Sequence, residues 1–193
     1  MERPADDVPR CGWATSAPEY VRYHDEEWGV PLHGDDALFE RLCLEAFQSG
    51  LSWITILRKR PAFRAAFAGF GVDAVAAFDD TDVERLMADA GIVRNRAKVL
   101  AAIANARVVQ QLDVGLDALL WSFAPTGPRP RPGTLADVPA STPESTAMAA
   151  ELRRRGLRFV GPTTAYALMQ ATGMVDDHVA GCWRAGGADH PSR

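Results

Sequence analysis

The sequence has 193 residues, 47% of them hydrophobic, and a formal net charge of -4. This length suits one compact domain, or two small lobes around a cleft, with a sizeable buried core. The negative net charge excludes a surface that is uniformly positive, and no apolar run is long enough to span a bilayer. The charged N-terminus also lacks the apolar run of a secretory signal, so we expect a cytoplasmic protein.

Three cysteines, Cys11, Cys43 and Cys182, lie far apart in the sequence. An odd number in a reducing compartment argues against a disulfide framework and favours metal binding or simple burial. Cys43 lies in an apolar segment and is expected in the core. Basic side chains gather in three acid-free segments, which can contact phosphates or can simply be solvated helix faces. These segments are 58–64, 94–107 and 153–158.

Apolar residues at helical spacing predict helices in the first half of the chain. Residues 35–48 form the first strong pattern, with an acidic start that suits a helix N-terminus. Residues 52–59 and 61–68 are predicted as two short helices, because Pro61 separates them.

The next helix is expected to begin at Thr81, with Glu84 completing a capping box, and to stop at Gly91. Residues 95–111 predict a long helix and residues 116–122 a short one.

Residues 124–134 are dominated by proline and glycine and are expected to form a surface loop. Thr142 then caps a further helix that has Pro143 at its first position. No alternating strand pattern persists, so the chain is predicted to be all-α.

Two helices flank the segment GLRFVGPT, and together they span about residues 143–173. The turn is expected to contain Gly156, Gly161 and Pro162, with Gly161 permitting a tight turn close to a phosphate. Thr163 and its neighbours then offer unpaired amides at a helix N-terminus, which is an anion site. Such a unit can grip a DNA backbone without reading sequence. An ordinary antiparallel helix pair fits the same pattern.

Four possible metal ligands lie at the two ends of the chain: Cys11 and His24 near one, His178 and Cys182 near the other. A Cys₂His₂ set would satisfy tetrahedral zinc and leave no position for a catalytic water. Spacing alone favours unrelated buried residues over a metal site. His33 and His190 have no partner at metal spacing and are expected to be exposed.

Four segments together resemble the bacterial 3-methyladenine DNA glycosylase I family of the helix-hairpin-helix superfamily. They are CGW…YVRYHDEEWGVP, CLEAFQSGLSWITILRKR, AGIVRNRAKVLAAIANA and FVGPTTAYALMQATGMVDDHVAGC. The resemblance runs from about Cys11 to Cys182, and its motifs are long and specific.

The resemblance implies a single helical glycosylase domain over residues 1–193, with two lobes around a cleft and flexible tails at 1–10 and 185–193. It implies that one structural zinc, held by the four cysteines and histidines named above, joins the N- and C-terminal regions. It assigns the catalytic pocket glutamate to Glu45 and pocket aromatics to Tyr23 and Trp53. Further candidates in the same motifs are Tyr20, Trp13 and Trp28.

These assignments make chemical sense for a cationic substrate. Methylation at N3 gives adenine a positive charge and makes it a good leaving group. Electron-rich Trp53 and Tyr23 can stack on a cationic purine, and an ionised Glu45 can accept from its amine. The alternatives are an exposed helix position for Glu45 and plain core positions for the two aromatics.

Three further positions have open interpretations. Gly50 and Leu51 suit a wedge that fills the gap left by an extruded base, unless Leu51 is core. Phe47 either narrows the pocket or packs in the core. Asp176 in VDDHV stands where many helix-hairpin-helix glycosylases carry a catalytic aspartate, but we expect it to cap a helix that holds His178.

The predicted function is therefore base-excision repair, in which the base is flipped out and its N-glycosidic bond hydrolysed. The expected partner is double-stranded DNA carrying 3-methyladenine, bound by a monomer at the nucleoid and not at a membrane. The two lysines, Lys59 and Lys98, are not beside the hairpin, which disfavours a Schiff-base mechanism. A zinc-stapled module that binds damage without excision, or a protein-interaction domain, are the alternative classes.

Overall fold

The computed structural model describes residues 8–127 and 129–185, and every regular element in these residues is helical. In chain order the elements are η1 (Gly12–Thr15), α1 (Pro18–Glu26), α2 (Asp35–Gln48), α3 (Trp53–Ala66), η2 (Ala68–Phe70), α4 (Val72–Ala76), α5 (Asp80–Ala88), α6 (Arg96–Val109), α7 (Gly115–Trp121), η3 (Leu135–Asp137), α8 (Pro143–Arg154) and α9 (Pro162–Ala171). The all-α prediction is confirmed. None of the helices described combines the length and the apolar character needed to cross a membrane.

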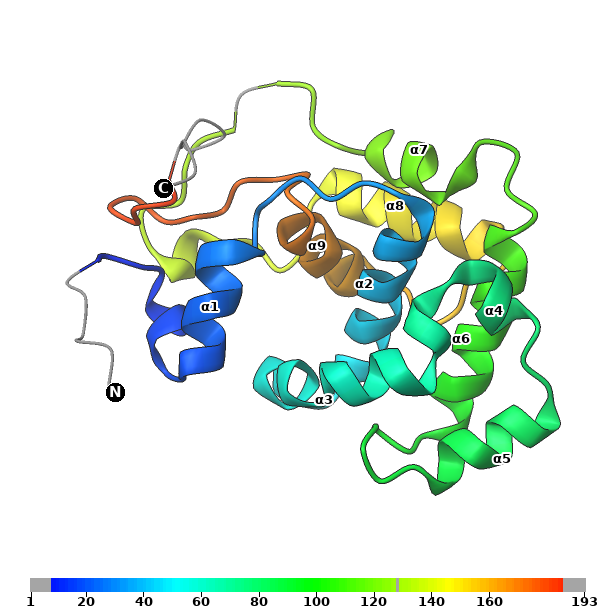
Figure 1. Ribbon diagram of the computed structural model, residues 1–193. Helices are drawn as coiled ribbons and strands as arrows, with labels where there is room; N and C mark the ends of the chain where they lie inside the picture. The colour runs from blue at the N-terminus through cyan, green and yellow to red at the C-terminus, as the bar shows by residue number, and fades with distance from the viewer. Residues whose placement is uncertain (1–7, 128, 186–193) are drawn as a thin grey trace.

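Helix α2 is the centre of the molecule (Figure 1). It packs against α3, α4, α6, α7 and α9, and all ten residues of 38–47 are buried. A helix that is buried on every side is expected to be apolar all round, yet α2 carries three buried ionisable side chains, Glu40, Arg41 and Glu45. Helices α4, α5 and α6 lie on one side of α2, while α1 and the C-terminal segment lie on the other.

Two predicted helices proved to be one. Helix α3 runs from Trp53 to Ala66 with Pro61 inside it, so the prediction of a break at Pro61 was wrong. A proline removes one backbone hydrogen bond, but Leu57 and Phe63 on either side of it are both buried. Core packing of both halves therefore keeps the helix continuous.

The predicted cap of α5 was also wrong. The N-cap is Asp79, whose side chain accepts from the amides of Thr81 (2.8 Å) and Asp82 (3.2 Å). Asp82 completes the capping box, and Glu84 instead pairs with Arg96. The prediction for α8 is confirmed, because Thr142 caps it and Pro143 occupies its first turn.

The two ends of the described chain meet. The amide of Trp183 donates to the carbonyl of Pro9 at 2.9 Å, and Arg10 donates to the carboxylate of Asp25. Residues 8–10, which were predicted to be part of a flexible tail, are thus held by hydrogen bonds. Residues 1–7 and 186–193, including His190, lie outside the described residues.

Candidate functional site

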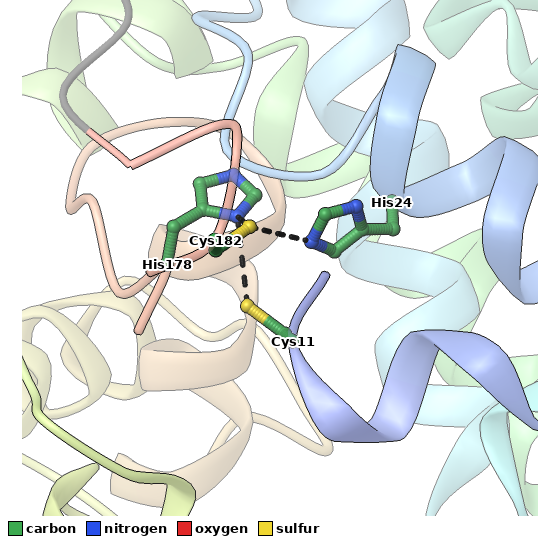
Figure 2. A group of neighbouring side chains, drawn as sticks. All are labelled: Cys11, His24, His178 and Cys182. Atoms are coloured by element: carbon green, nitrogen blue, oxygen red, sulfur yellow. Dashed lines mark hydrogen bonds between the residues drawn. The ribbon is translucent and has the colours of Figure 1, made fainter. Parts of the chain in front are cut away.

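The four predicted metal ligands come together although most of the chain separates them (Figure 2). Cys11 precedes η1, His24 lies in α1, and His178 and Cys182 lie on the segment after α9. All four side chains are buried, and their ligand atoms lie within 4.8 Å of one another.

The distances inside this cluster match a metal site. The Sγ atom of Cys182 is 3.4 Å from Nε2 of His24 and 3.6 Å from Nδ1 of His178, and Sγ of Cys11 is 3.7 Å from the same Nδ1. A tetrahedral zinc with ordinary bond lengths would place sulfur and nitrogen ligands about 3.6 Å apart. The cluster could therefore hold a metal ion without moving its ligands far.

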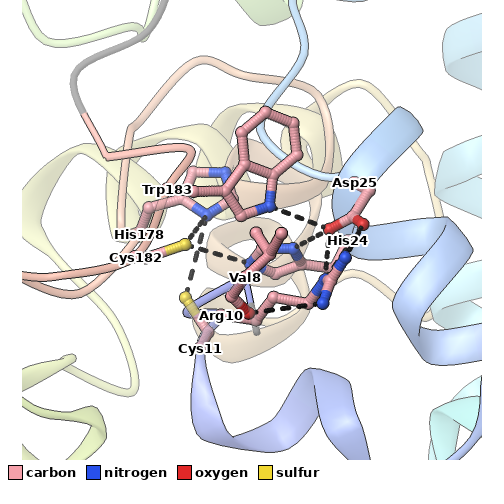
Figure 3. A network of polar contacts seen from close by, with 8 residues as sticks. All are labelled: Val8, Arg10, Cys11, His24, Asp25, His178, Cys182 and Trp183. Carbon is pink, nitrogen blue, oxygen red and sulfur yellow. Dashed lines mark hydrogen bonds and ion pairs between the residues drawn. The ribbon is translucent and has the colours of Figure 1, made fainter. Parts of the chain in front are cut away.

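A second layer of contacts orients His24 (Figure 3). Its Nδ1 atom is 2.8 Å from Oδ1 of Asp25, so Nδ1 carries the proton and Nε2 presents a lone pair to the cluster. Arg10 and the indole nitrogen of Trp183 also donate to Asp25. A carboxylate behind a histidine is the usual second layer of a metal site. Burial lowers the pKa of His178 to about 4, so this imidazole too is neutral, as a ligand must be.

Beside this cluster lies a pocket of about 580 Å³. Its lining residues are Trp13, Ser16, Tyr20, Tyr23, Trp28, Glu45, Gln48, Trp53, Leu135, Val138, Ala167, Gln170, Ala171 and Asp177. All six residues predicted to bind or act on the base, Glu45 and the five aromatics, are therefore in one pocket.

The aromatic wall of the pocket rests on the ligand cluster. The ring of Trp28 lies 4.6 Å from that of His178, and the ring of Trp13 lies 5.4 Å from that of His24. Trp13 and Trp28 meet edge to face at 5.1 Å. The ligand histidines thus form the back of the wall that faces the pocket.

Glu45 enters the pocket from α2 with only 6% of its surface exposed. Of the three buried ionisable residues of α2, Glu40 pairs with Arg64 and Arg41 pairs with Glu27. None of the ion pairs among the described residues includes Glu45. Burial raises the pKa of Glu45 to about 8, although the charge of Arg41 opposes this. The protonated form therefore dominates in the empty pocket at neutral pH, and only a cation in the pocket would favour the ionised form expected from the sequence.

Asp176 does not face the pocket. Its Oδ1 atom accepts from the amide of His178 at 3.1 Å, and its Oδ2 atom pairs with Arg131 at 2.8 Å. The expectation that Asp176 stays out of the pocket agrees with these contacts, but the prediction that it caps a helix was wrong, because residues 176–179 form no helix.

The next residue, Asp177, lines the pocket and is 5% exposed. The sequence reading missed it, as it missed Gln170, which donates to Asp177 at 2.8 Å. The available signal was Tyr166 and Gln170, four residues apart on one helix and therefore on one face. Their partner could not be read from spacing alone.

The predicted wedge is exposed at the end of α2. Leu51 is 42% exposed, so the alternative that Leu51 is core was wrong. Gly50 has a φ of +85° that favours glycine. The ammonium group of Lys98 holds this turn by donating to the carbonyls of Phe47 (3.0 Å) and Ser49 (2.8 Å).

The turn between α8 and α9 differs from the prediction in two respects. Gly161 is the N-cap of α9 with a φ of -111°, which any residue can adopt, so it is not the residue that makes the turn tight. The left-handed positions are Gly156 (+100°) and Phe159 (+57°). Asn105 fixes the turn by bonding both the amide and the carbonyl of Arg158. Pro162, which was predicted to be part of the turn, is the first residue of α9, and Thr163 lies at the helix N-terminus as predicted.

The remaining expectations concern core and surface. Cys43 is buried in the core, as predicted. Phe47 is fully buried and packs 4.8 Å from the ring of Phe63, so it belongs to the core and does not narrow the pocket. His33 is exposed, with a hydrogen bond to Asp117.

The family model described as methyladenine glycosylase matches residues 13–185. The chain belongs to the methyladenine glycosylase family.

Named relatives agree with this assignment. The chain is 48% identical to DNA-3-methyladenine glycosylase 1 of Escherichia coli strain K12 over 91% of this chain and 96% of that protein. A crystal structure of 3-methyladenine DNA glycosylase I matches with a TM-score of 0.86 and 44% identity, covering 91% of this chain and 98% of the other. A tyrosine-to-phenylalanine variant of 3-methyladenine DNA glycosylase I in complex with 3-methyladenine matches with a TM-score of 0.83 and 33% identity. The match covers 90% of this chain and 95% of the other.

The raised pKa of Glu45 predicts how stability changes with pH. The pKa of the Glu45 carboxyl group is about 8 in the folded chain and 4.5 for an unperturbed group, as in the unfolded chain. Between these two pH values the unfolded chain loses this proton while the folded chain keeps it, so the free energy of unfolding falls as pH rises. Glu45→Gln cannot titrate. The free energy of unfolding of the wild type should therefore fall relative to that of Glu45→Gln from about pH 5 to about pH 8 and then level off.

Urea unfolding of both proteins at several pH values measures this difference. Both proteins contain the Cys/His cluster, so its contribution to the pH dependence cancels in the comparison. A difference that stays constant with pH would show that Glu45 is ionised throughout.

Proposed function

We propose that this chain is a monomeric, monofunctional DNA glycosylase that hydrolyses the N-glycosidic bond of 3-methyladenine in double-stranded DNA. The observation that carries the proposal is Glu45, a buried carboxyl group without a cationic partner in an aromatic pocket. A cationic purine supplies the missing charge, and Tyr23 and Trp53, whose rings meet at 5.6 Å, supply π-faces for it. The named relatives act on or bind the same base.

Among the described residues, no lysine offers an amine to the pocket for covalent catalysis. Lys59 donates to the carbonyls of Ala90 and Gly91, and Lys98 donates to the wedge turn. Neither residue lines the pocket. This supports direct hydrolysis and argues against cleavage of the strand through a Schiff base.

We further propose that the metal held by Cys11, His24, His178 and Cys182 is a single structural zinc. The chemistry of the donors supports zinc, because two thiolates and two imidazoles are a preferred set for a closed tetrahedral site. When bound, the ion would neutralise the thiolates and join the two chain ends. The pocket chemistry does not require it to contact substrate.

DNA contact is assigned to two turns, as a helix-hairpin-helix glycosylase would use them. The turn of Gly161, Pro162 and Thr163 leads into α9, where a phosphate can bind the free backbone amides of Gly161, Thr163 and the residue after it; Pro162 has no amide hydrogen and only shapes the turn. The turn at Gly50 and Leu51 presents an exposed apolar side chain that can replace an extruded base.

The first test is release of the base. Incubation with alkylated duplex DNA should release 3-methyladenine, which is separated and identified by chromatography. Glu45→Gln should lower single-turnover release about ten- to hundredfold, because an amide donor facing the purine amine leaves a buried polar group unpaired at a cost of about 1–3 kcal/mol. Wild-type protein that releases no base would exclude the proposed activity, and an unchanged rate in the variant would remove Glu45 from base recognition.

The zinc proposal is tested by elemental analysis and thermal melting. Wild-type protein should contain one zinc per chain, and Cys182→Ala should lose zinc and stability together. Cys43→Ala is the matched control, since this buried cysteine is not among the ligands and its loss should leave the zinc content unchanged. Metal-free wild type with an unaltered Tm would contradict the proposal.

The wedge proposal predicts a separation of activity from stability. Because Leu51 is exposed, Leu51→Ala should leave Tm nearly unchanged while slowing excision from duplex DNA. Excision from single-stranded DNA, where no partner base has to be displaced, should change much less. Equal losses on both substrates would show that Leu51 is not a wedge.

A further inference from the structure

When a cationic base leaves the nucleotide, the positive charge moves from the base to the sugar. The bond between C1′ and the base breaks, its electron pair leaves with the base, and the base becomes neutral. The sugar then carries the positive charge until the oxygen of a water molecule bonds to C1′ and releases its proton to bulk water. A site that favours this reaction benefits from negative charge near the sugar as well as near the base.

The pocket contains two carboxyl groups. Among its lining residues in the described part of the chain, Glu45 and Asp177 are the ones that can carry charge. They come from different walls: Glu45 from the central helix α2, beside the aromatic rings, and Asp177 from the segment that follows α9. Asp177 also lines a neighbouring cavity of about 330 Å³ whose other charged residues are Arg129, Arg131 and Asp137. It therefore stands between the base pocket and a second cavity that carries two arginines.

Asp177 is held in one orientation by its Oδ2 atom. This oxygen accepts from the hydroxyl of Tyr166 at 2.5 Å and from Nε2 of Gln170 at 2.8 Å. The guanidinium of Arg129 donates to the same tyrosine oxygen at 2.9 Å. Because arginine can only donate, the tyrosine hydroxyl must give its own proton to Asp177.

The other oxygen of Asp177 keeps room for a further hydrogen bond. Its Oδ1 atom forms a long ion pair with Nη1 of Arg129 at 3.8 Å, but it accepts no hydrogen bond within the described residues. Two donors on Oδ2 fix the carboxylate before substrate arrives, so no reorganisation is needed when charge develops. This is the arrangement that makes electrostatic stabilisation effective.

We propose that Asp177 is a catalytic carboxylate whose Oδ1 atom faces the positive sugar and accepts a hydrogen bond from the incoming water, while Glu45 serves the base. The proposal rests on the glycosylase function given above. Tyr166 and Gln170 are then positioning residues that act through Asp177. Asp176, the neighbouring acid, is excluded from this role because Arg131 and the His178 amide hold it away from the pocket.

The test compares adjacent isosteric variants, Asp177→Asn and Asp176→Asn. The first readout is single-turnover release of 3-methyladenine. Asp177→Asn should slow release about ten- to hundredfold, whereas Asp176→Asn should change it less than about threefold, since asparagine also accepts from a backbone amide. Binding of free 3-methyladenine should remain within about twofold in both variants.

The second readout is binding to two duplexes that need no excision. One carries a pyrrolidine sugar analogue, which is cationic, and the other carries tetrahydrofuran, which is neutral. Wild type, Asp176→Asn and Glu45→Gln should all prefer the cationic analogue, and Asp177→Asn should lose most of that preference. A purely structural role would weaken both duplexes equally and leave the ratio of the two Kd values unchanged.

Zinc content and Tm are measured on each variant because Asp177 precedes His178. If Asp177→Asn fails to fold, Tyr166→Phe replaces it, since this change removes the donor that orients Asp177 but retains the buried ring. It should lower both the release rate and the preference for the cationic duplex, by smaller factors. An unchanged Kd ratio in the variant that folds, or an equal loss in Asp176→Asn, overturns the proposal. Absence of base release by the wild type would instead overturn the glycosylase function, while the Kd ratio would still report on Asp177.

Discussion

The closure of the chain ends by the Cys11, His24, His178 and Cys182 cluster is the constraint on which the pocket depends. The aromatic wall of residues 13–28 lies on η1, on α1 and on the turn after α1 that carries Trp28; η1 and α1 pack mainly on each other and on α3. Short elements of this kind cannot bury enough apolar surface to hold a fixed position alone. The cluster ties them to the segment after α9, and Arg10, Asp25 and Trp183 add hydrogen bonds to the same junction. The position of the aromatic wall therefore depends on the Cys/His cluster, although the cluster does not line the pocket.

The second constraint is the distribution of charge around α2. Arg41 and Arg60 both donate to Glu27, which holds the pKa of that carboxyl at about 2 despite its burial. These cations are thus already paired, and Glu45 stays without a partner. A neutral purine would bury Glu45 further without supplying a countercharge, whereas a methylated cationic purine supplies one. In the proposed function, a cationic purine would therefore favour ionised Glu45, whereas a neutral base would leave this carboxyl group protonated.

Much of this could be predicted from the sequence because the signals were local or carried by long motifs. Apolar spacing placed α2 at residues 35–48, where the structure has it, and Thr142 with Pro143 marked the start of α8. The ligand set and the pocket aromatics followed from resemblance, since spacing alone favoured unrelated residues for the cluster. Only the fold could bring residues 11 and 182 together.

The errors arose where several residues satisfied the same local rule. Asp79 and Thr81 are both good caps, and the hydrogen bonds of the folded chain select the first. Pro61 would end an isolated helix, but burial on both sides of it carries α3 through. Asp176 and Asp177 are adjacent acids, and only the contacts from Tyr166 and Gln170 on α9 distinguish them. In each case the deciding interaction is tertiary, so no pattern within a short window could have identified it.

The proline-rich loop shows how a segment without regular structure can still define a site. Its composition predicted a surface connection, and residues 129–134 indeed have no helix. Yet Arg131 donates to the carbonyl of His178 at 3.0 Å, and the carbonyl of Pro132 accepts from the amide of Ala180 at 2.8 Å. Prolines restrict the unfolded chain and so reduce the entropy lost when the loop is ordered. The loop therefore contacts one side of the segment that carries His178, Cys182 and Asp177, while Gln170 and Tyr166 of α9 contact Asp177 from the other side.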